Sequence, residues 1–453
     1  MTTVKAGVDR SRPPRPGPLG SFEFPDFSSV RLDNGLLVLA ASMPRVPLAS
    51  LQILIPAGGQ FDALDQPGLA SLHGDLLDEG TAARSSLEIA GLVEGLGGSM
   101  SSGAGWNMAY VETGLLSRHL AAGLELLAEI VRSPDFPPDE IERLRHQRQA
   151  EILRRKDHPA SLAEECFSAA VYRGTVYGRP LIGTEDSLAR IDRDGLRDFC
   201  RRHVVPDGST LIAVGDLDPD ETIALVQSRL GDWPRVQPPD PPTIEPPPLA
   251  GTEVHIVDRP GSAQTQLQLG HASVPRDHPD FPQMTLLNTI FGGKFTSRIN
   301  LNLREEHGFT YGAQSLFTRR KGPGPFIVRA AVATEVAGAA VEQLLIEMRR
   351  IRREPVTREE LEETQDYLIG VFPYTLQTIG DLAKRLEAIA IFDLPMDYYD
   401  TFPAVLAEVS QDDVLAAARR HFDPDHLAIV AVGPAEQLEP QLAGIGPVHV
   451  HQP

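Results

Sequence analysis

The chain contains an internal repeat, and this repeat limits how it can fold more than any other sequence feature. Nine residues in a stretch of 22 recur at a constant offset of 218 positions: Asp194, Arg201, Arg202, His203, Pro206, Asp207, Ala213, Val214 and Gly215 match Asp412, Arg419, Arg420, His421, Pro424, Asp425, Ala431, Val432 and Gly433. In both copies a helix pattern ends near the paired arginines, and a Pro-Asp turn leads into a short apolar strand. The repeat therefore indicates a duplicated domain.

A proline-rich segment separates two halves of similar size. Residues 233–251 hold eight prolines, which remove backbone donors and favour extended polyproline geometry. We predict an N-terminal extension at 1–24, a first domain at 25–232, a linker at 233–250 and a second domain at 251–453. With 453 residues in all, each domain is large enough to bury a core.

Each half mixes strands and helices in a broadly repeated order. The first half has strand patterns at 30–41 and 51–56, and helix patterns at 68–77, 86–96, 118–132, 138–156 and 219–230. The second half has strand patterns at 253–257, 265–271, 310–318 and 326–332, and helix patterns at 279–290, 297–306, 335–353 and 358–372. We therefore expect an α+β fold in which each half packs helices on one sheet.

Composition excludes several classes of function. The formal net charge of −20 would repel phosphate backbones, so nucleic acid is not an expected partner. No apolar run approaches the roughly 18 residues of a membrane span, so no membrane is expected either. Two cysteines, Cys166 and Cys200, cannot form a disulfide framework, and residues 1–20 lack the apolar stretch of a secretory signal. Since few of the basic residues are lysine, as in GC-rich bacterial genomes, we expect a bacterial cytoplasmic protein.

The segment at 65–81, DQPGLASLHGDLLDEGT, opens a helix after a strand. It resembles the zinc-helix segment of the inverzincin metallopeptidases, the family of pitrilysin, insulin-degrading enzyme and mitochondrial processing peptidase, in which Gly-Leu-Ala precedes H-x-x-E-H and Gly-Thr follows. That family is also built from duplicated α+β domains, so the resemblance covers nearly the whole chain. It implies that each domain is a mostly antiparallel sheet covered by helices, and that the chain forms half of a clamshell.

The family's catalytic motif is absent from this segment. Aligned on Gly68 and Gly80, Ser71 and Asp75 take the two histidine positions and Gly74 takes the position of the general base. Losing two imidazoles and the glutamate between them removes the metal and the base together. The resemblance also places Glu151 at about the position of the third ligand, where it is either a remnant or an exposed helix residue.

A substitute metal site from His73, Asp75 and Glu151 is not expected. Residues two apart on a helix project about 200° apart, so His73 and Asp75 cannot converge on one ion. We therefore expect a structural helix and no metal or other cofactor in this chain.

A second segment, residues 291–311, matches the family much more closely. FGGKFTSRINLNLREEHGFTY follows the family pattern G-G-x-x-x-S-R-L-x-x-x-L-R-E-x-x-G-x-x-Y and departs only at Ile299. The resemblance assigns Arg304 and Tyr311 to holding the substrate backbone and its developing oxyanion across the cavity from zinc. A guanidinium and a phenol suit that chemistry because both are directional donors. The alternative is that Arg304 pairs with Glu305 or Glu306 and that Tyr311 is a core residue of a strand.

Other candidates are weaker. Gly58-Gly59 and Gly97-Gly98 lack the ending of a phosphate-binding loop and are interpreted as turns. His203 and His421 stand at equivalent helix ends, where a cation favours the helix dipole, so we assign them to architecture. His307 lies near Arg304 in sequence and is interpreted as a solvated turn residue.

The leading hypothesis is a catalytically silent subunit of a heterodimeric zinc metallopeptidase. The resemblance implies that a homologous partner with an intact H-x-x-E-H carries the zinc, and that this chain supplies Arg304 and Tyr311 to the peptide substrate in trans. A structural or peptide-binding scaffold without a proteolytic partner is the second hypothesis. An independent hydrolase with an unorthodox metal site is the third.

Overall fold

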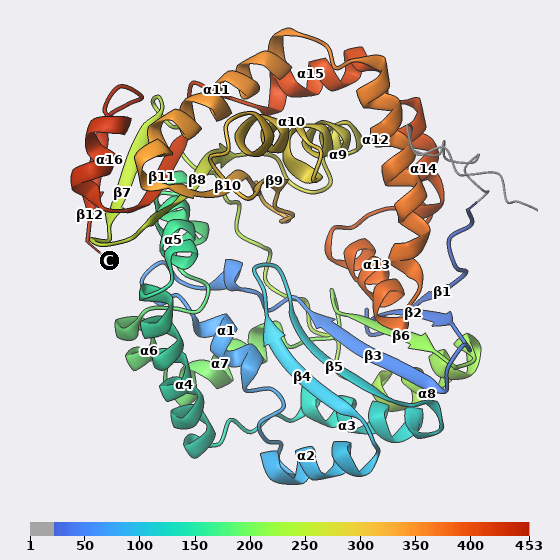
Figure 1. The fold of residues 1–453 in the computed structure, drawn as a ribbon. Coiled ribbons are helices and arrows are strands. Elements are labelled where there is room, and N and C mark those ends of the chain that lie inside the picture. The colour runs from blue at the N-terminus through green and yellow to red at the C-terminus, as the bar shows by residue number, and fades with distance from the viewer. Residues whose placement is uncertain (1–21, 453) are drawn as a thin grey trace, which may run out of the picture.

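The computed structural model describes residues 22–452, so most of the predicted extension at 1–24 lies outside the described residues. Two six-stranded sheets, one in each half, form the frame of the described chain (Figure 1). The strand orders are β1-β2-β6-β3-β5-β4 and β12-β7-β11-β8-β10-β9. Most neighbouring strands are antiparallel, and the parallel pairs are β2–β6, β11–β7 and β12–β7. The predicted α+β fold with two mostly antiparallel sheets is therefore confirmed.

The first half runs from β1 to α8. Its strands are β1 (Ser28–Arg31), β2 (Leu37–Ser42), β3 (Leu48–Ile55), β4 (Ser99–Ala104), β5 (Ala109–Leu116) and β6 (Thr210–Gly215). Its helices are α1 (Leu69–Asp75), α2 (Ser86–Gly95), α3 (Leu120–Arg132), α4 (Pro138–Lys156), α5 (Pro159–Val171), α6 (Glu185–Arg190), α7 (Arg193–His203) and α8 (Pro219–Leu230).

The second half runs from β7 to β12. Its strands are β7 (Glu253–Asp258), β8 (Gln264–Ala272), β9 (Ala313–Phe317), β10 (Pro325–Ala333), β11 (Ala428–Gly433) and β12 (Val448–His451). Its α-helices are α9 (Phe281–Asn288), α10 (Arg298–Asn300), α11 (Ala337–Arg353), α12 (Arg358–Val371), α13 (Ile379–Ile391), α14 (Tyr398–Glu408), α15 (Gln411–His421) and α16 (Ala435–Leu442). Two π-helical turns, η4 (Thr289–Gly293) and η5 (Leu301–Glu306), flank α10.

The repeated segments occupy equivalent places in the two sheets. Helix α7 leads into β6 and helix α15 leads into β11, and both strands stand third in their sheet. Every residue of β6 and of β11 is buried. The sequence repeat is thus the central strand of each sheet together with the helix before it.

The prediction of one continuous strand at 30–41 is wrong, because the chain forms the hairpin β1–β2 there. Arg31 pairs with Leu37, and the turn between them contains Gly35 in the left-handed region with φ +96°. The Asp33-Asn34-Gly35 turn divides the apolar run, and such sequences favour reversal of the chain. The sequence patterns also gave no indication of the hairpin β4–β5, of helices α5 and α13, or of the short edge strand β12.

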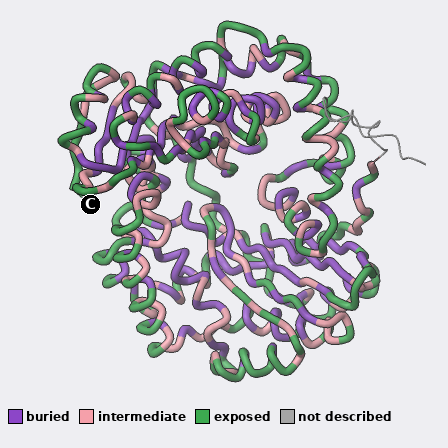
Figure 2. The backbone as a smooth tube through the Cα atoms, viewed as in Figure 1, coloured by how far each residue is buried: buried purple, intermediate pink, exposed green. Residues whose placement is uncertain are grey.

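Each sheet is covered on one face by its own helices and on the other by a helix from the opposite half (Figures 1 and 2). Helix α13 packs on β3 and β6 of the first sheet, and α5 packs on β8 and β11 of the second. Leu386 of α13 joins Leu39 and Val214 in one buried cluster, whereas Phe167 of α5 joins Val430 in another. Both faces of the central strands are therefore buried, which explains their continuous apolar sequences.

The segment between the halves carries no helix or strand from 234 to 249, as its prolines predict. No helix among residues 22–452 has the length and apolar character needed to cross a membrane.

We expect Leu386→Ala to lower the free energy of unfolding by about 2–5 kcal/mol, because it removes a fully buried side chain from the contact between α13 and the first sheet. Leu87→Ala is the control, since Leu87 is 83 % exposed on α2, and surface changes of this kind stay within about 0.5 kcal/mol. Chemical denaturation followed by circular dichroism measures both. Equal stability of the two variants would contradict the packing of α13 on the first sheet.

Candidate functional site

Helix α1 carries the positions that the sequence aligned with zinc ligands. It begins after Gly68, whose φ of +95° lies in the left-handed region, and the buried carboxylate of Asp62 accepts hydrogen bonds from the amides of Gly68 and Ala70, both at 2.8 Å. This carboxylate caps the orphan amides of the first turn. Burial raises the pKa of Asp62 to about 7, although the two amides favour its charged form.

A guanidinium stands among the positions aligned with metal ligands. Arg148 of α4 forms an ion pair with Asp75 at the end of α1, and its Nη1 lies 3.8 Å from Oε2 of Glu151. The Arg148 side chain is only 10 % exposed. Burial raises the pKa of Asp75, and Arg148 opposes that shift. A fixed cation thus neutralises two of the carboxylates that sequence reasoning had considered for a metal.

Gly74, at the general-base position, has no space for a side chain. A Cβ built there would lie 2.5 Å from the carbonyl carbon of Gly103 and 2.7 Å from the amide nitrogen of Ala104, both in β4. The hydroxyl oxygen of Ser102 also lies 2.7 Å from the carbonyl oxygen of Gly74 and 2.8 Å from Oδ1 of Asp78, so its single proton is shared between two acceptors. Strand β4 therefore closes on the face of α1 from which a base would have to project.

His73 lies on the opposite side of α1, inside the core. Its ring packs beside Phe136 and Phe199 with centroids 5.3 and 5.1 Å away, and neither ring nitrogen has a hydrogen-bond partner. Burial lowers the pKa of His73 to about 3, so the ring is neutral. Since Asp75 projects toward Arg148, His73 and Asp75 do not converge.

The two repeated histidines are buried and not helix-end cations. Burial lowers the pKa of His203 to about 4, and it also lowers the pKa of His421, whose Nε2 lies 2.7 Å from Oδ2 of Asp280. Both rings pack inside the fold, which agrees with an architectural role, and burial disfavours the cationic form on which the dipole argument relied.

The second segment is held by buried polar contacts. Asn300 accepts from the amide of Ala313 at 2.9 Å and donates to its carbonyl at 2.8 Å, while Arg298 makes two hydrogen bonds to Glu360 at 2.8 and 2.9 Å. Residues 298–306 are helical as predicted, but residues 310–312 precede β9, which starts at Ala313. The predicted strand at 310–318 therefore begins three residues too early.

Arg304 and Tyr311 lie at the surface of this segment. Tyr311 is 94 % exposed, so it is not a core residue. The guanidinium of Arg304 donates to Oε1 of Glu305 at 2.9 Å, and its Cζ lies 3.5 Å from the ring centroid of Phe295. Within residues 22–452 no hydrogen bond joins the Arg304 and Tyr311 side chains. Phe295 is itself 72 % exposed, whereas the Arg304 side chain beneath it is only 15 % exposed.

A cleft of about 490 Å³ opens beside these residues. It is lined by the glycine pair of the segment, by Lys294 and Phe295, and by the start of the edge strand β9. His307 is exposed and stacks on Phe309 with centroids 4.9 Å apart, which fits a solvated turn. The segment belongs to the second sheet and α1 to the first, so the two candidate regions lie in different halves (Figure 1).

Sequence reasoning missed Arg148 as the decisive residue of the first region. It stands three residues before Glu151, the spacing at which helix residues are neighbours. An arginine beside a lost ligand position was therefore a usable signal.

Two family models match the chain. The model described as insulinase, peptidase family M16, matches residues 37–185. The model described as the peptidase M16 inactive domain matches residues 190–368.

Relatives and solved structures agree with these matches. A protein of Rickettsia bellii named as an uncharacterized zinc protease is 22 % identical, and the match covers 90 % of this chain and 98 % of that one. The uncharacterized zinc protease YmxG of Bacillus subtilis is 21 % identical over 89 % and 98 %. The crystal structure of a peptidase M16 inactive domain from Pseudomonas fluorescens has a TM-score of 0.84 at 27 % identity, covering 90 % of this chain and 98 % of that one. A protease from Helicobacter pylori shares the fold, with a TM-score of 0.84 at 18 % identity over 91 % and 100 %.

We expect Gly74→Ala to lower the free energy of unfolding by about 1–3 kcal/mol, because its methyl group meets the backbone of β4. Gly91→Ala is the matched control on α2, where no atom lies within 4 Å of the added carbon. That change should raise stability by about 0.4–1 kcal/mol through the unfolded chain. A neutral Gly74→Ala in the same denaturation assay would mean that β4 leaves room for a base.

Proposed function

The chain belongs to the M16 family of metallopeptidases, and we propose that it is a catalytically silent subunit of a heterodimeric zinc metallopeptidase. The observation that carries the proposal is the ion pair of Arg148 with Asp75 at positions where active relatives need metal ligands. A metal at these positions would face a resident positive charge, and charges about 4 Å apart repel strongly in a poorly solvated site. No ligand histidine and no base would offset that repulsion.

The proposed partner is a homologous chain with an intact H-x-x-E-H, and the proposed substrate is a peptide. The zinc of the complex would belong to the partner, where it would polarise the scissile carbonyl and activate water. This chain would contribute the face that carries Arg304 and Tyr311. The Tyr311 side chain is almost fully exposed and therefore accessible to a molecule outside the chain. The Arg304 side chain is only 15 % exposed beside the ring of Phe295, so a substrate would reach the outer edge of its guanidinium.

Arg304 and Tyr311 would bind the substrate and stabilise the developing oxyanion. Nε and Nη2 of Arg304 contact Glu305, whereas its Nη1 is buried and has no hydrogen-bond partner in the structure, so a substrate carbonyl that displaces Glu305 would meet the first two nitrogens. The stacking on Phe295 fixes the plane of the guanidinium, so less freedom is lost when a substrate carbonyl binds. Preorganised donors of this kind stabilise charge that develops only in the transition state.

A peptide-binding scaffold without a proteolytic partner is the alternative function. The contact of Arg304 with Glu305 favours it, because the guanidinium already has a carboxylate partner without any substrate. In that case the same face would bind peptide without hydrolysis anywhere in a complex.

The isolated chain should hydrolyse no peptide, whereas its complex with the homologous partner should do so in a chelator-sensitive manner. Co-expression with a neighbouring reading frame that encodes H-x-x-E-H, followed by size-exclusion chromatography and a fluorogenic peptide assay, tests this. Separate elution of the two chains at micromolar concentration would count against the heterodimer. Chelator-sensitive hydrolysis by the isolated chain would refute the silent subunit.

Arg304→Ala and Tyr311→Phe should each lower kcat/KM of the assembled complex by about 10²–10³, the usual cost of losing one oxyanion donor. Zinc content of the partner and assembly should not change, because neither side chain is buried in the core. Arg201→Ala and Tyr374→Phe serve as matched controls at exposed positions outside the segment. Full activity per intact complex in both test variants would contradict the role of Arg304 and Tyr311 and would favour the scaffold function.

A further inference from the structure

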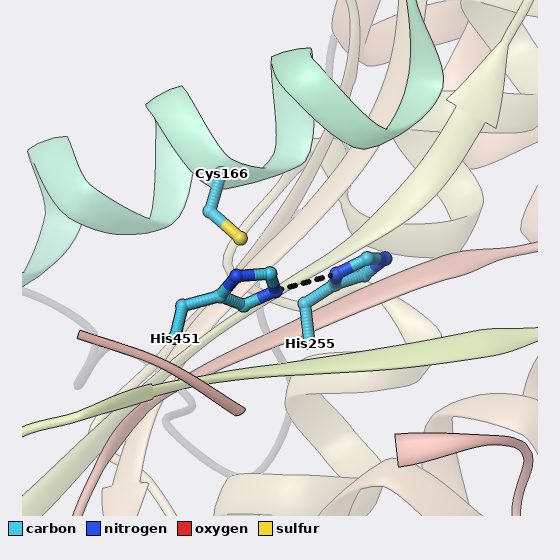
Figure 3. A group of neighbouring side chains, drawn as sticks. All are labelled: Cys166, His255 and His451. Atoms are coloured by element: carbon cyan, nitrogen blue, oxygen red, sulfur yellow. Dashed lines mark hydrogen bonds between the residues drawn. The ribbon is translucent and has the colours of Figure 1, made fainter. Parts of the chain in front are cut away.

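Three side chains from distant parts of the sequence meet where the two halves join. Cys166 comes from α5 of the first half, His255 from β7 and His451 from the edge strand β12 of the second half (Figure 3). Their Sγ and ring nitrogen atoms all lie within 4.8 Å of one another, and Nδ1 of His255 is 3.0 Å from Nε2 of His451. Figure 3 shows the thiol directed at the pair of imidazoles.

We propose that Cys166, His255 and His451 bind a borderline-soft divalent cation of the Zn²⁺ class and so fasten the C-terminal strand to α5. One thiolate and two imidazoles are the donor set that Zn²⁺ and Co²⁺ favour. With metal–nitrogen bonds of about 2.0–2.1 Å and tetrahedral angles, two nitrogens lie roughly 3.3 Å apart. The two imidazole nitrogens are thus already spaced for one ion.

A carboxylate lies behind His255. Oε1 of Glu253 is 3.2 Å from Nε2 of His255, too poorly aligned for a hydrogen bond in the structure but close enough to favour a proton on Nε2. The other ring nitrogen, Nδ1, faces His451. Carboxylates behind the distal nitrogen of a histidine are typical of metal ligands. Glu253 also pairs with Arg173, which follows α5, so the same carboxylate links the two halves.

The site has an entry path and a free coordination position. It lines a cleft of about 720 Å³ together with the C-terminal residues and the start of α6. His451 is exposed, whereas Cys166 is half-buried and His255 is buried. An ion would therefore reach three protein ligands from solvent and keep water at a fourth position.

Binding of the ion displaces one proton from the three ligands. The Cys166 thiol loses one proton to solvent when the metal–sulfur bond forms. Each histidine binds as a neutral ring, with its proton on the nitrogen that does not face the ion, so neither changes its number of protons. Each ion bound therefore releases one proton, and no redox partner is needed.

The only other described cluster of this type, His278, Asp280 and His421, fits a cation less well. Asp280 lies 2.8 Å from Nη1 of Arg420 and 2.7 Å from Nε2 of His421, so its carboxylate is already occupied. It contains no thiol, and this difference lets one measurement distinguish the two clusters.

The experiment is a Co²⁺ titration of the purified full chain followed by absorbance. We expect one Co²⁺ per chain with a thiolate-to-cobalt charge-transfer band in the near ultraviolet, and displacement of that band by Zn²⁺. Cys166→Ser should abolish the band, and His451→Asn should weaken binding more than the about 10–100-fold expected for Glu253→Gln, which removes only a supporting contact. Because His451 is exposed, its replacement tests the site even if Cys166→Ser fails to fold.

Two controls lie close in chemistry or in space. His449→Asn changes the residue of β12 that lies opposite His255 of β7 and stacks on its ring with centroids 5.2 Å apart. Cys200→Ser changes the other cysteine, on α7. Both should bind Co²⁺ within about two-fold of the parent chain. A missing band in the parent chain, a band that persists in Cys166→Ser, or unchanged affinity in His451→Asn would each overturn the proposal.

This site departs from the sequence-based expectation that the chain holds no metal, and it is independent of the proposed function. Peptide hydrolysis by a heterodimer and Co²⁺ binding by the isolated chain are separate measurements, so either result stands when the other fails.

Discussion

The exchange of one helix between the two halves is the packing constraint on which the rest of the molecule depends. Neither sheet can bury both faces with its own helices, so α13 covers β3 and β6 while α5 covers β8 and β11. Since hydrophobic burial is the main favourable term in folding, these two contacts fix the position of one half against the other, which the proline-rich segment alone would not do. They also fix the position of helix α1 relative to the segment that carries Arg304. Because α5 carries Cys166, the same exchange places a thiol next to the imidazoles of the second sheet.

The first half lacks the family's metal ligands, and its charges oppose metal binding as well. Ser71, Gly74 and Asp75 alone would leave carboxylates and space, from which a weak metal site could be imagined. Arg148 removes that option because its guanidinium pairs with Asp75 and approaches Glu151. Strand β4 removes the remaining space beside Gly74. A permanent cation that is covalently part of the chain thus takes the place that an exchangeable cation would need.

The second half retains a different kind of order. Asn300 and Arg298 hold the segment through buried hydrogen bonds, yet Phe295 and Tyr311 face solvent. Folding alone gives no reason to expose the rings of Phe295 and Tyr311, since burying them would be favourable. Exposed aromatic residues beside an arginine are common where proteins bind partners. The segment is thus held in place by buried hydrogen bonds while its aromatic rings are exposed, which supports a role in contacting another molecule.

The sequence by itself determined the duplication, the α+β class, most helices and the loss of the H-x-x-E-H motif, because periodicity and motif spacing are local properties of the chain. It missed the β1–β2 turn at Gly35 and the start of β9, where a turn interrupts an apolar run. Only the tertiary structure decided that Arg148 meets Asp75 and that Cys166 meets His255 and His451. The partners in these contacts lie 73 or more residues apart, and Cys166 reaches them only through a helix exchanged between halves. No pattern along the chain encodes such a meeting, since it depends on how whole sheets and helices pack.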